Sequence, residues 1–235
     1  MPRPALWTAI SDNLTRDIAA GRYRPGDKLP TEAELSARFG VNRHTVRRAL
    51  QAMSDGGLVH SRRGAGVFVA ATPTDYPLGR RVRFNQNLRA AGRVPGREIL
   101  MSETRSADPG EARALAIDPG DPVHVYETLA TADGVPIALG AGVFPARRIP
   151  NFLEALHSTD TVTDALAACG IMDYTRASTR VTALLATPTQ AVRLRLAEGA
   201  PILKTSSVNI DPDGVAIEYG ETLFAGDRVA LTLEA

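Results

Sequence analysis

Two short helices separated by a tight turn and followed by a glycine-tipped hairpin are the pattern that most constrains this chain. Thr31 and Glu34 have the T-x-x-E spacing of a capping box, and they start a first helix that Gly40 ends. Asn42 can cap a second helix, whose apolar residues recur at i, i+3, i+4 and i+7 from Val46. Because this spacing buries one face, the segment is predicted to fold as a helix-turn-helix.

The flanking segments extend this unit. The apolar residues between Trp7 and Ile18 repeat every three or four positions, which predicts a preceding helix. After two glycines, 58–60 and 67–69 can pair as strands across a tip that contains Arg62, Arg63 and Gly64. The whole segment therefore reads as a winged helix-turn-helix.

Arginines follow one side of the second helix of the pair. Arg43 and Arg47 lie one turn apart, away from the apolar face. In a helix-turn-helix the second helix enters the DNA major groove, where an arginine can donate twice to guanine. Asn42 and Thr45, with the free N–H groups of the helix start, can hold a phosphate.

Charge is distributed unevenly along the chain. Residues 1–70 contain 11 Lys and Arg against 6 Asp and Glu, whereas the remainder contains 16 against 20. A charged helix face alone is usually only solvated. Together with the capped helices and the basic wing, however, this concentration of positive charge predicts that the N-terminal region binds double-stranded DNA.

Several segments of this region carry a family resemblance. Pro25-Gly-Asp-Lys-Leu-Pro-Thr-Glu32, Gly40-Val-Asn-Arg43 and Thr45-Val-Arg47 resemble the winged-helix domain of the GntR family of bacterial transcription regulators. The resemblance covers residues 4–70, with Ala33 where some members carry a DNA-contacting arginine. It implies DNA contacts from the second helix of the region, the start of the third and the wing. The implied positions are Arg43, His44, Thr45, Arg47, Arg63 and Gly64.

The chain of 235 residues is long enough for two domains. We predict a DNA-binding domain over 1–70, a linker over 71–79 that contains Thr-Pro-Thr-Asp-Tyr-Pro, and a second domain over 80–235. With the single cysteine, Cys169, no intramolecular disulfide can form. No apolar run approaches the length of a membrane span, so we expect a cytoplasmic protein without a membrane partner.

The second domain contains an internal repeat at a shift of 79 residues. The shift places Ala107, Pro109, Leu115, Gly120 and Pro122 on identical residues at 186, 188, 194, 199 and 201. Each copy reads as a short capped helix that starts with proline, a glycine stop, and a strand hairpin. We therefore predict an antiparallel sheet with helices packed on it, built from two halves related by a rough two-fold.

This arrangement resembles the UTRA effector domain of the HutC subfamily of GntR regulators, whose fold is similar to that of chorismate lyase. The resemblance covers about 75–233 and implies an α+β protein, a homodimer and a palindromic operator. Segments such as Asp75-Tyr-Pro-Leu-Gly and Asp173-Tyr-Thr-Arg176 look most like regulators of phosphonate utilisation. A ligand-responsive regulator, expected to be a repressor, is the implied function.

Members of this subfamily bind small anions between the two halves. Arg81 and Arg83 alternate along an extended segment that leads into a helix start at Asn85, and Arg176 and Arg180 lie four apart on a predicted strand, hence on one face. Thr161 and Thr163 lie at another helix start, where relatives use Ser and Tyr. The candidate effector-binding residues are Arg81, Arg83, Phe84, Asn85, Tyr126, Thr161, Thr163, Arg176, Glu218 and Tyr219.

Other functions stay open at this point. The effector could be a phosphonate or phosphate ester, or another anionic metabolite such as an organic acid or a sugar phosphate. Thr128 and Ala130 stand where relatives that sense amino-sugar phosphates have an Arg-x-Arg, which disfavours a sugar phosphate. The second domain could also serve only as a dimeriser, or act as a lyase. We expect no catalytic residue, metal site or cofactor, because no metal-ligand cluster, phosphate loop or nucleophile motif occurs.

Overall fold

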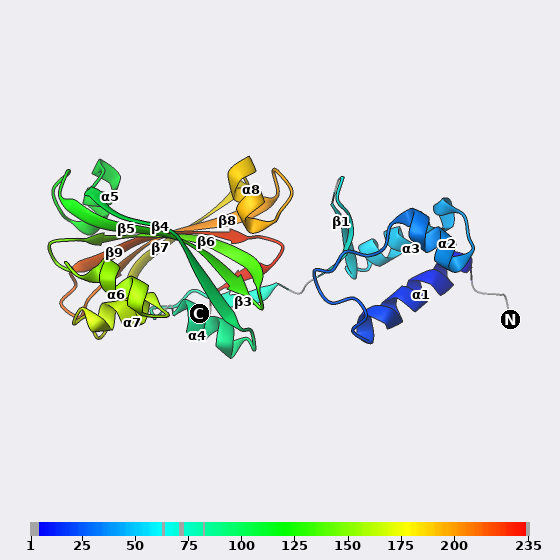
Figure 1. Cartoon of the computed structure of the whole chain (residues 1–235), viewed down its shortest axis with the longest axis horizontal. Coiled ribbons are helices and arrows are strands. Elements are labelled where there is room, and N and C mark those ends of the chain that lie inside the picture. Colours follow the sequence, from blue (N-terminus) through cyan, green and yellow to red (C-terminus); the bar gives the residue numbers. More distant parts are fainter. Residues whose placement is uncertain (1–4, 63, 71–72, 82, 234–235) are drawn as a thin grey trace. The chain divides into compact units, whose positions relative to one another are not determined.

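A computed structural model describes residues 5–62, 64–70, 73–81 and 83–233 of the chain (Figure 1). The chain divides into two compact units, Met1–Thr72 and Pro73–Ala235, which are described separately below.

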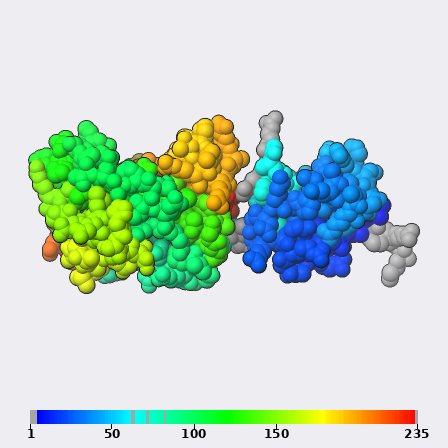
Figure 2. Space-filling model, in the orientation of Figure 1, coloured from blue at the N-terminus to red at the C-terminus, as the bar shows by residue number. Residues whose placement is uncertain are grey.

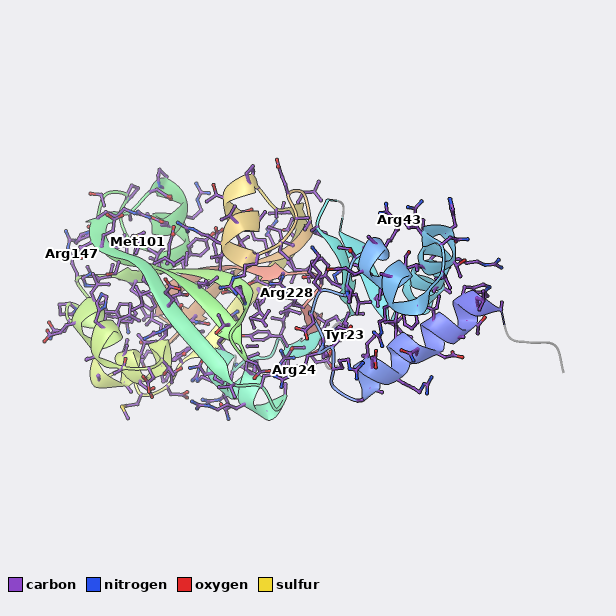
Figure 3. The ribbon with its side chains drawn as sticks, turned by 45° about the vertical axis from the view of Figure 1, so that its right-hand side comes forward. Tyr23, Arg24, Arg43, Met101, Arg147 and Arg228 are labelled. Carbon is purple, nitrogen blue, oxygen red and sulfur yellow. The ribbon has the colours of Figure 1, made fainter. Side chains whose placement is uncertain are left out.

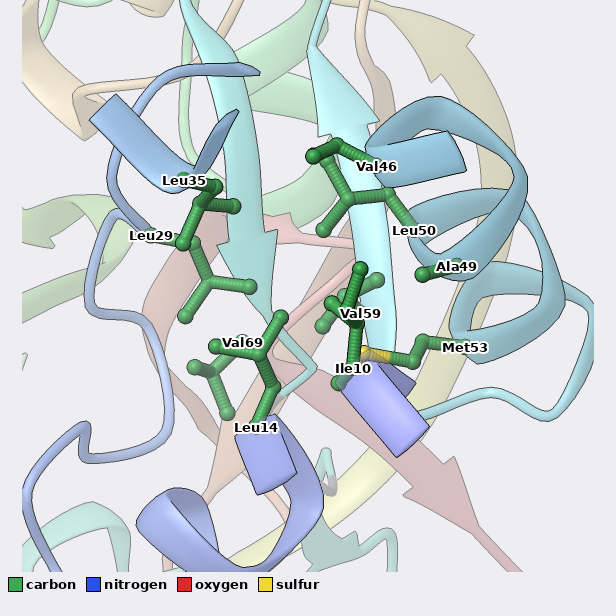
Figure 4. Close-up of a cluster of buried hydrophobic side chains, with 10 residues drawn as sticks. All are labelled: Ile10, Leu14, Leu29, Leu35, Val46, Ala49, Leu50, Met53, Val59 and Val69. Carbon is green, nitrogen blue, oxygen red and sulfur yellow. The ribbon is translucent and has the colours of Figure 1, made fainter. Parts of the chain in front are cut away.

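The N-terminal unit consists of three helices and a two-stranded hairpin. They are α1 (Leu6–Ala19), α2 (Glu32–Phe39), α3 (Arg43–Asp55), β1 (Val59–Arg62) and β2 (Gly66–Val69). Buried side chains from all five elements and from the segment before α2 form one core (Figure 4). They are Ile10, Leu14, Leu29, Leu35, Val46, Ala49, Leu50, Met53, Val59 and Val69. The unit is the predicted winged helix-turn-helix.

The local signals in the sequence form as predicted. The Thr31 backbone N–H donates to Glu34 Oε2 at 2.7 Å and the Glu34 N–H donates to Thr31 Oγ1 at 3.3 Å, which completes the capping box. Gly40 ends α2 in the left-handed region at φ 64°. Asn42 caps α3 by accepting the Thr45 N–H at 2.9 Å. Caps at both ends of the turn therefore determine where α2 stops and α3 starts.

The wing forms the predicted hairpin, with strands that begin at Val59 and Gly66 and not at 58 and 67. Val59 lies opposite Val69 and His60 opposite Phe68, so each pair of neighbours points to the same side of the hairpin. An isolated bridge from Lys28 to Phe68 adds the segment before α2 to its edge. Arg63, in the tip, lies outside the described residues.

The second unit is built on a six-stranded antiparallel sheet in the order β4-β5-β6-β9-β8-β7. The strands are β4 (Pro95–Ser106), β5 (Pro122–Ala132), β6 (Val135–Pro145), β7 (Thr175–Leu185), β8 (Pro201–Ile210) and β9 (Ala216–Ala225). The central pair, β6 and β9, joins two hairpins that have the same connectivity. Each half of the sheet therefore contributes three consecutive strands in the same order from its edge to the centre, as expected for two halves related by a two-fold axis.

Helices cover both faces of this sheet. One face carries α5 (Pro109–Leu115) and α8 (Pro188–Leu194), which stand as two separate bulges on the surface (Figures 1 and 2). The other carries α4 (Phe84–Ala90), α6 (Phe152–Ser158) and α7 (Val162–Ala168). Each face thus has its own apolar clusters, and the second encloses the site described below.

The internal repeat is present in the structure and longer than the sequence indicated. Helices α5 and α8 both start at a proline, and both have a residue in the left-handed region at the C-cap, Ala116 and Arg195. In addition, the helix and strand that precede α5 in the chain, α4 and β4, correspond to those that precede α8, which are α7 and β7. The duplicated unit is therefore helix, strand, helix and hairpin.

Several segments differ from the prediction. Residues 74–77 of the predicted linker form β3 (Thr74–Pro77), which pairs in parallel with β10 (Val229–Thr232), so most of this segment belongs to the second unit. Prolines stop a helix there but are compatible with a short strand at a sheet edge. Helix α6 and the strands β4 and β10 were not predicted. No helix among the described residues is long and apolar enough to cross a membrane.

Candidate functional site

The start of α3 presents polar and basic side chains to solvent. Arg43 and His44 are exposed and form no hydrogen bond with another described side chain, and Arg43 projects from the helix away from the core of its unit (Figure 3). Thr45 is half-buried, and its hydroxyl donates to the Asn42 side chain at 3.0 Å. The first turn of α3 can therefore meet a groove with Arg43 and His44.

Arg47 lies one turn further along and is held by the neighbouring helix. Its Nε donates to Glu32 Oε1 at 2.9 Å and its Nη2 to Glu32 Oε2 at 2.7 Å. This two-point bond to Arg47 lowers the pKa of Glu32. Arg47 is still 63% exposed, so α2 orients its guanidinium at the surface.

The remaining DNA candidates have distinct surroundings. The side-chain oxygen of Asn42 is engaged as the α3 cap. Gly64 lies in the wing turn with φ 75°, a conformation that glycine adopts without strain. Arg48, although next to Arg47, lies over the Trp7 ring at 4.9 Å and so packs toward α1.

The second unit contains a cavity of about 490 Å³ on the sheet face that carries α4, α6 and α7. Three groups of side chains line it. Strands β4 to β9 contribute Arg97, Tyr126, Thr128, Ala130, Ala138, Gly140, Arg176, Asn209, Glu218 and Thr222. Helix α4 and its N-cap contribute Arg83, Phe84, Asn85, Gln86 and Arg89, and the start of α7 contributes Asp160, Thr161, Val162, Thr163 and Asp164. Tyr76 and Tyr174 complete the wall.

The sheet register explains which strand residues face the cavity. Asn209 of β8 lies opposite Glu218 of β9, and Tyr126 of β5 lies opposite Gly142 of β6. Directly paired residues on neighbouring strands point to the same side of a sheet. A Cβ at Gly142 would lie 2.4 Å from the Tyr126 ring, so glycine is required there for the tyrosine to lie against the sheet.

Two arginines at the cavity have buried nitrogens without partners. Arg83 stacks over the Tyr174 ring at 3.7 Å and donates from Nη2 to the Tyr174 carbonyl at 3.3 Å. Arg97 donates from Nη2 to the carbonyls of Leu156 and Thr159 at 3.2 and 2.7 Å. In both, Nη1 is buried with no hydrogen-bond partner among the described residues. Such donors call for an acceptor that the protein does not supply.

A third arginine is part of a buried polar chain. Arg176 Nε donates to Asn209 Oδ1 at 2.9 Å, and Asn209 Nδ2 donates to Glu218 Oε2 at 2.5 Å. Burial raises the pKa of Glu218, although Arg176, Asn209 and Arg83 act in the opposite direction. The cavity thus contains both signs of charge.

Most of the residues predicted for the effector lie together. Those that line the cavity are Arg83, Phe84, Asn85, Tyr126, Thr161, Thr163, Arg176 and Glu218. Two do not: Arg81 is exposed and pairs with Asp173, and Tyr219 lies on the opposite sheet face, where its hydroxyl donates to Glu221 at 2.9 Å. Because neighbours on a strand point to opposite faces, Glu218 and Tyr219 cannot share one site.

The prediction that Arg176 and Arg180 share a strand face is wrong. A bulge between Arg176 and Ser178 shifts the register, so Arg176 pairs with Asn209 but Arg180 with Ser206. Residues 206 and 209 of β8 point to opposite faces, and Arg180 is therefore directed away from the cavity.

Sequence reasoning missed Arg97, although a signal for it existed. Its position, shifted by the repeat length of 79, is that of Arg176. In the sheet Arg97 pairs with Ala130 as Arg176 pairs with Asn209, so the two arginines occupy equivalent places in the two halves. Extending the repeat back from Ala107 would have found the pair.

Comparisons with known proteins agree with both units. The family description "Bacterial regulatory proteins, gntR family" matches residues 6–69, and "UTRA domain" matches 90–230. An uncharacterized HTH-type transcriptional regulator of Rhizobium meliloti (strain 1021) is 38% identical over 98% of this chain and 95% of its own length. The probable transcriptional regulator PhnF of Escherichia coli (strain K12) is 34% identical over 98% and 95%.

A solved relative shares the whole arrangement. The HTH-type transcriptional repressor PhnF of Mycolicibacterium smegmatis is 32% identical over 98% of this chain and 93% of its own length. The crystal structure of PhnF from Mycobacterium smegmatis matches with a TM-score of 0.68 at 30% identity, covering 96% of this chain and 98% of that one. A capped helix-turn-helix with a wing, an antiparallel-sheet domain around an arginine-lined cavity, and these matches lead to one conclusion. The chain belongs to the GntR family, as a ligand-responsive DNA-binding transcription regulator of the HutC type with a UTRA domain.

Proposed function

We propose that this regulator represses genes for phosphonate uptake or degradation and that its effector is a phosphonate or phosphate ester bound in the cavity of the second unit. The observation that carries the proposal is the set of Arg83, Arg97 and Arg176 around one cavity. Arginine donors match the oxygens of such a headgroup. The relatives named PhnF supply the phosphonate part of the proposal.

The DNA-contacting residues are proposed from the geometry of the N-terminal unit. Arg43, His44 and Arg47 would read bases from α3, and the Asn42–Thr45 turn and the wing, with Arg63 and Gly64, would meet the backbone. We further propose that two chains associate as a homodimer on a palindromic operator, because two-fold protein symmetry matches such a site.

The effector can act only if it distinguishes two arrangements of the dimer. A ligand that binds both arrangements equally shifts nothing, however tight its binding. The cavity offers a physical basis for such a difference, since it is lined from both halves of the sheet and from the helices α4 and α7. Closure of these elements around an anion would alter what the second unit presents to the rest of the chain.

The proposal is tested by DNA binding with and without candidate anions. An operator taken from the DNA upstream of the chain's own gene would be titrated with the full-length protein by fluorescence anisotropy. Addition of alkylphosphonates at millimolar concentration is expected to lower the affinity, whereas sulfate at equal ionic strength is not. No change with any phosphonate or phosphate ester would contradict the proposal.

An organic acid is the second candidate effector. Thr128 and Ala130 line the cavity, so β5 adds no cation to it, and the three arginines suffice for a carboxylate as well as for a phosphonate. The same titration with small carboxylic acids separates the two classes. We propose no catalytic role for the cavity.

A further inference from the structure

The buried carboxylate of Glu218 is the feature of the cavity that an anionic effector does not explain. Glu218 lies on β9 and is only 9% exposed, yet it lines the same space as the three arginines. An anion in this space would be repelled by a carboxylate charge. Apart from holding the Asn209 amide, a glutamate at this position offers a simple anion no favourable contact.

The bonding of Glu218 leaves part of its carboxylate unused. Oε2 accepts the Asn209 amide, whereas Oε1 accepts no hydrogen bond from a described residue, and no described Lys or Arg forms an ion pair with the group. A buried carboxylate is stable when a cation or several donors compensate it. Here a single amide donates to it, Arg176 and Arg83 favour its charge without pairing with it, and the side chain lines the cavity.

Arg176 and Glu218 are linked to each other through Asn209. Asn209 accepts from Arg176 Nε with its oxygen and donates to Glu218 with its nitrogen, so a single amide group separates the positive and the negative side chain. The Nη groups of Arg176 donate to no described residue. A ligand whose negative and positive groups lie a few bonds apart can place the first at Arg176 and the second at Glu218.

Aromatic rings complete the surroundings. Tyr76, Tyr126 and Tyr174 line the cavity, and the Arg83 guanidinium already stacks over Tyr174. Tyrosine rings attract an ammonium group over their faces, and more strongly where water is excluded.

We infer that the effector is a zwitterion in which Arg83, Arg97 and Arg176 hold the anionic headgroup and Glu218 holds an ammonium group. In this chain the class is an aminoalkylphosphonate or an amino-bearing phosphate ester, an inference that rests on the proposed phosphonate or phosphate effector. Glu218 would then determine specificity, because it repels anions without an amine and pairs with those that carry one.

Isothermal titration of the full-length protein with two matched ligands tests the inference. 2-Aminoethylphosphonate and ethylphosphonate share headgroup and chain and differ in the amine. The amine-bearing ligand is expected to bind about tenfold or more tightly, as for a buried charge-assisted hydrogen bond. In Glu218→Gln this preference should shrink towards one, and ethylphosphonate should bind at least as well as before, because a repelling charge is removed.

A control residue is available on the same strand. Glu221 lies on the opposite face of β9, paired with Lys204 at 2.6 Å, and Glu221→Gln should keep the wild-type preference. Equal affinity of the wild-type protein for both ligands would overturn the inference and leave the phosphonate proposal intact. An unchanged preference in Glu218→Gln would overturn the role of this residue. Binding of neither ligand would overturn the inference, whereas the proposed function would fail only if no phosphonate or phosphate ester changed operator binding. The wild-type comparison is decisive even if the variant fails to fold.

Discussion

Among individual residues, neighbouring arginines of α3 have different surroundings. Arg43 extends into solvent, Arg47 is bound at two points by Glu32, and Arg48 lies over Trp7. Successive residues of an α-helix are rotated by about 100° around its axis, so Arg48 faces a different side of α3 from Arg47. An arginine count therefore overstates the number of cations available to DNA. Arg43, which extends into solvent, and Arg47, which Glu32 orients, are the two that we propose for base contact.

Loss of Arg43 should weaken operator binding and relax its sequence preference. Arg43→Ala is expected to cost about 1–3 kcal/mol, because a base-reading fork is removed without disturbing the α3 core. Anisotropy titrations against the operator and single-base variants measure both effects. Arg16→Ala, at the exposed end of α1, is the matched control and should bind as the wild type does. Equal loss on all sequences would show a phosphate contact instead.

Arg83 and Arg81 provide a matched pair two residues apart. Arg83 lines the cavity, whereas Arg81 pairs outside it with Asp173. Charge reversal in Arg83→Glu should abolish the response of DNA binding to the effector and leave operator affinity without effector nearly unchanged. Arg81→Glu should keep the response. The measurement is operator affinity with and without effector, and an intact response in Arg83→Glu would exclude this residue from the site.

Among the elements, the two copies of the capped helix differ in charge. In α5 the box is formed by Asp108 and Glu111, and Arg105 binds Glu111 at two points, 2.6 and 2.7 Å. In α8 the same box is formed by Thr187 and Gln190, which are neutral. The geometry of the repeat is thus kept with different electrostatics.

This difference predicts a pH effect confined to α5. Hydrogen bonds from Arg105 and from the Asp108 N–H lower the pKa of Glu111 below its usual 4.5. A lowered pKa in the folded state contributes stability that is present above the unfolded value and is lost as the pH falls through the folded value. Glu111→Gln should therefore be less stable than the wild type at neutral pH, and the difference should vanish in acid.

Denaturant titrations between neutral pH and about pH 3 measure this difference in the free energy of unfolding. The opposite copy supplies the control, since Gln190 bonds to Thr187 and to no arginine in the described part of the chain, and Gln190→Glu should not reproduce the acid dependence of Glu111. A pH-independent destabilisation in Glu111→Gln would show that packing, and not the ion pair, is lost.

At the scale of the whole molecule, each unit has its own hydrophobic core, and the unfolding of each can be followed by its own signal. The single tryptophan, Trp7, packs on the N-terminal core, whereas the cavity belongs entirely to the second unit. An effector present at 100 times its Kd should stabilise the unit that binds it by about 2.7 kcal/mol. Thermal unfolding followed by calorimetry should show one transition raised by the effector. The transition reported by Trp7 fluorescence should stay in place, and its shift would contradict the assignment of the site.

Local chemistry made much of the fold predictable. The caps at Thr31 and Asn42, the stop at Gly40 and the helical spacing from Val46 each act within a few residues, so the winged helix could be derived without tertiary information. The two-fold sheet was predicted from the repeat, because each copy carries its own capped helix, glycine stop and hairpin. The strand β3 and helix α6 were missed because their short segments are stabilised by packing partners distant in sequence, such as β10.

The sequence by itself determined the two units, the helix-turn-helix of a DNA-binding regulator and the residue types that we propose for an anion. Tertiary structure decided which of those residues meet. A bulge in β7 directs Arg180 away from the cavity, and the alternation of side chains along β9 places Tyr219 and Glu218 on opposite faces. The pairing of β4 with β5 places Arg97 at the cavity. Register and curvature are properties of paired strands. For this reason the charge arrangement around Glu218 exists only once all six strands are assembled.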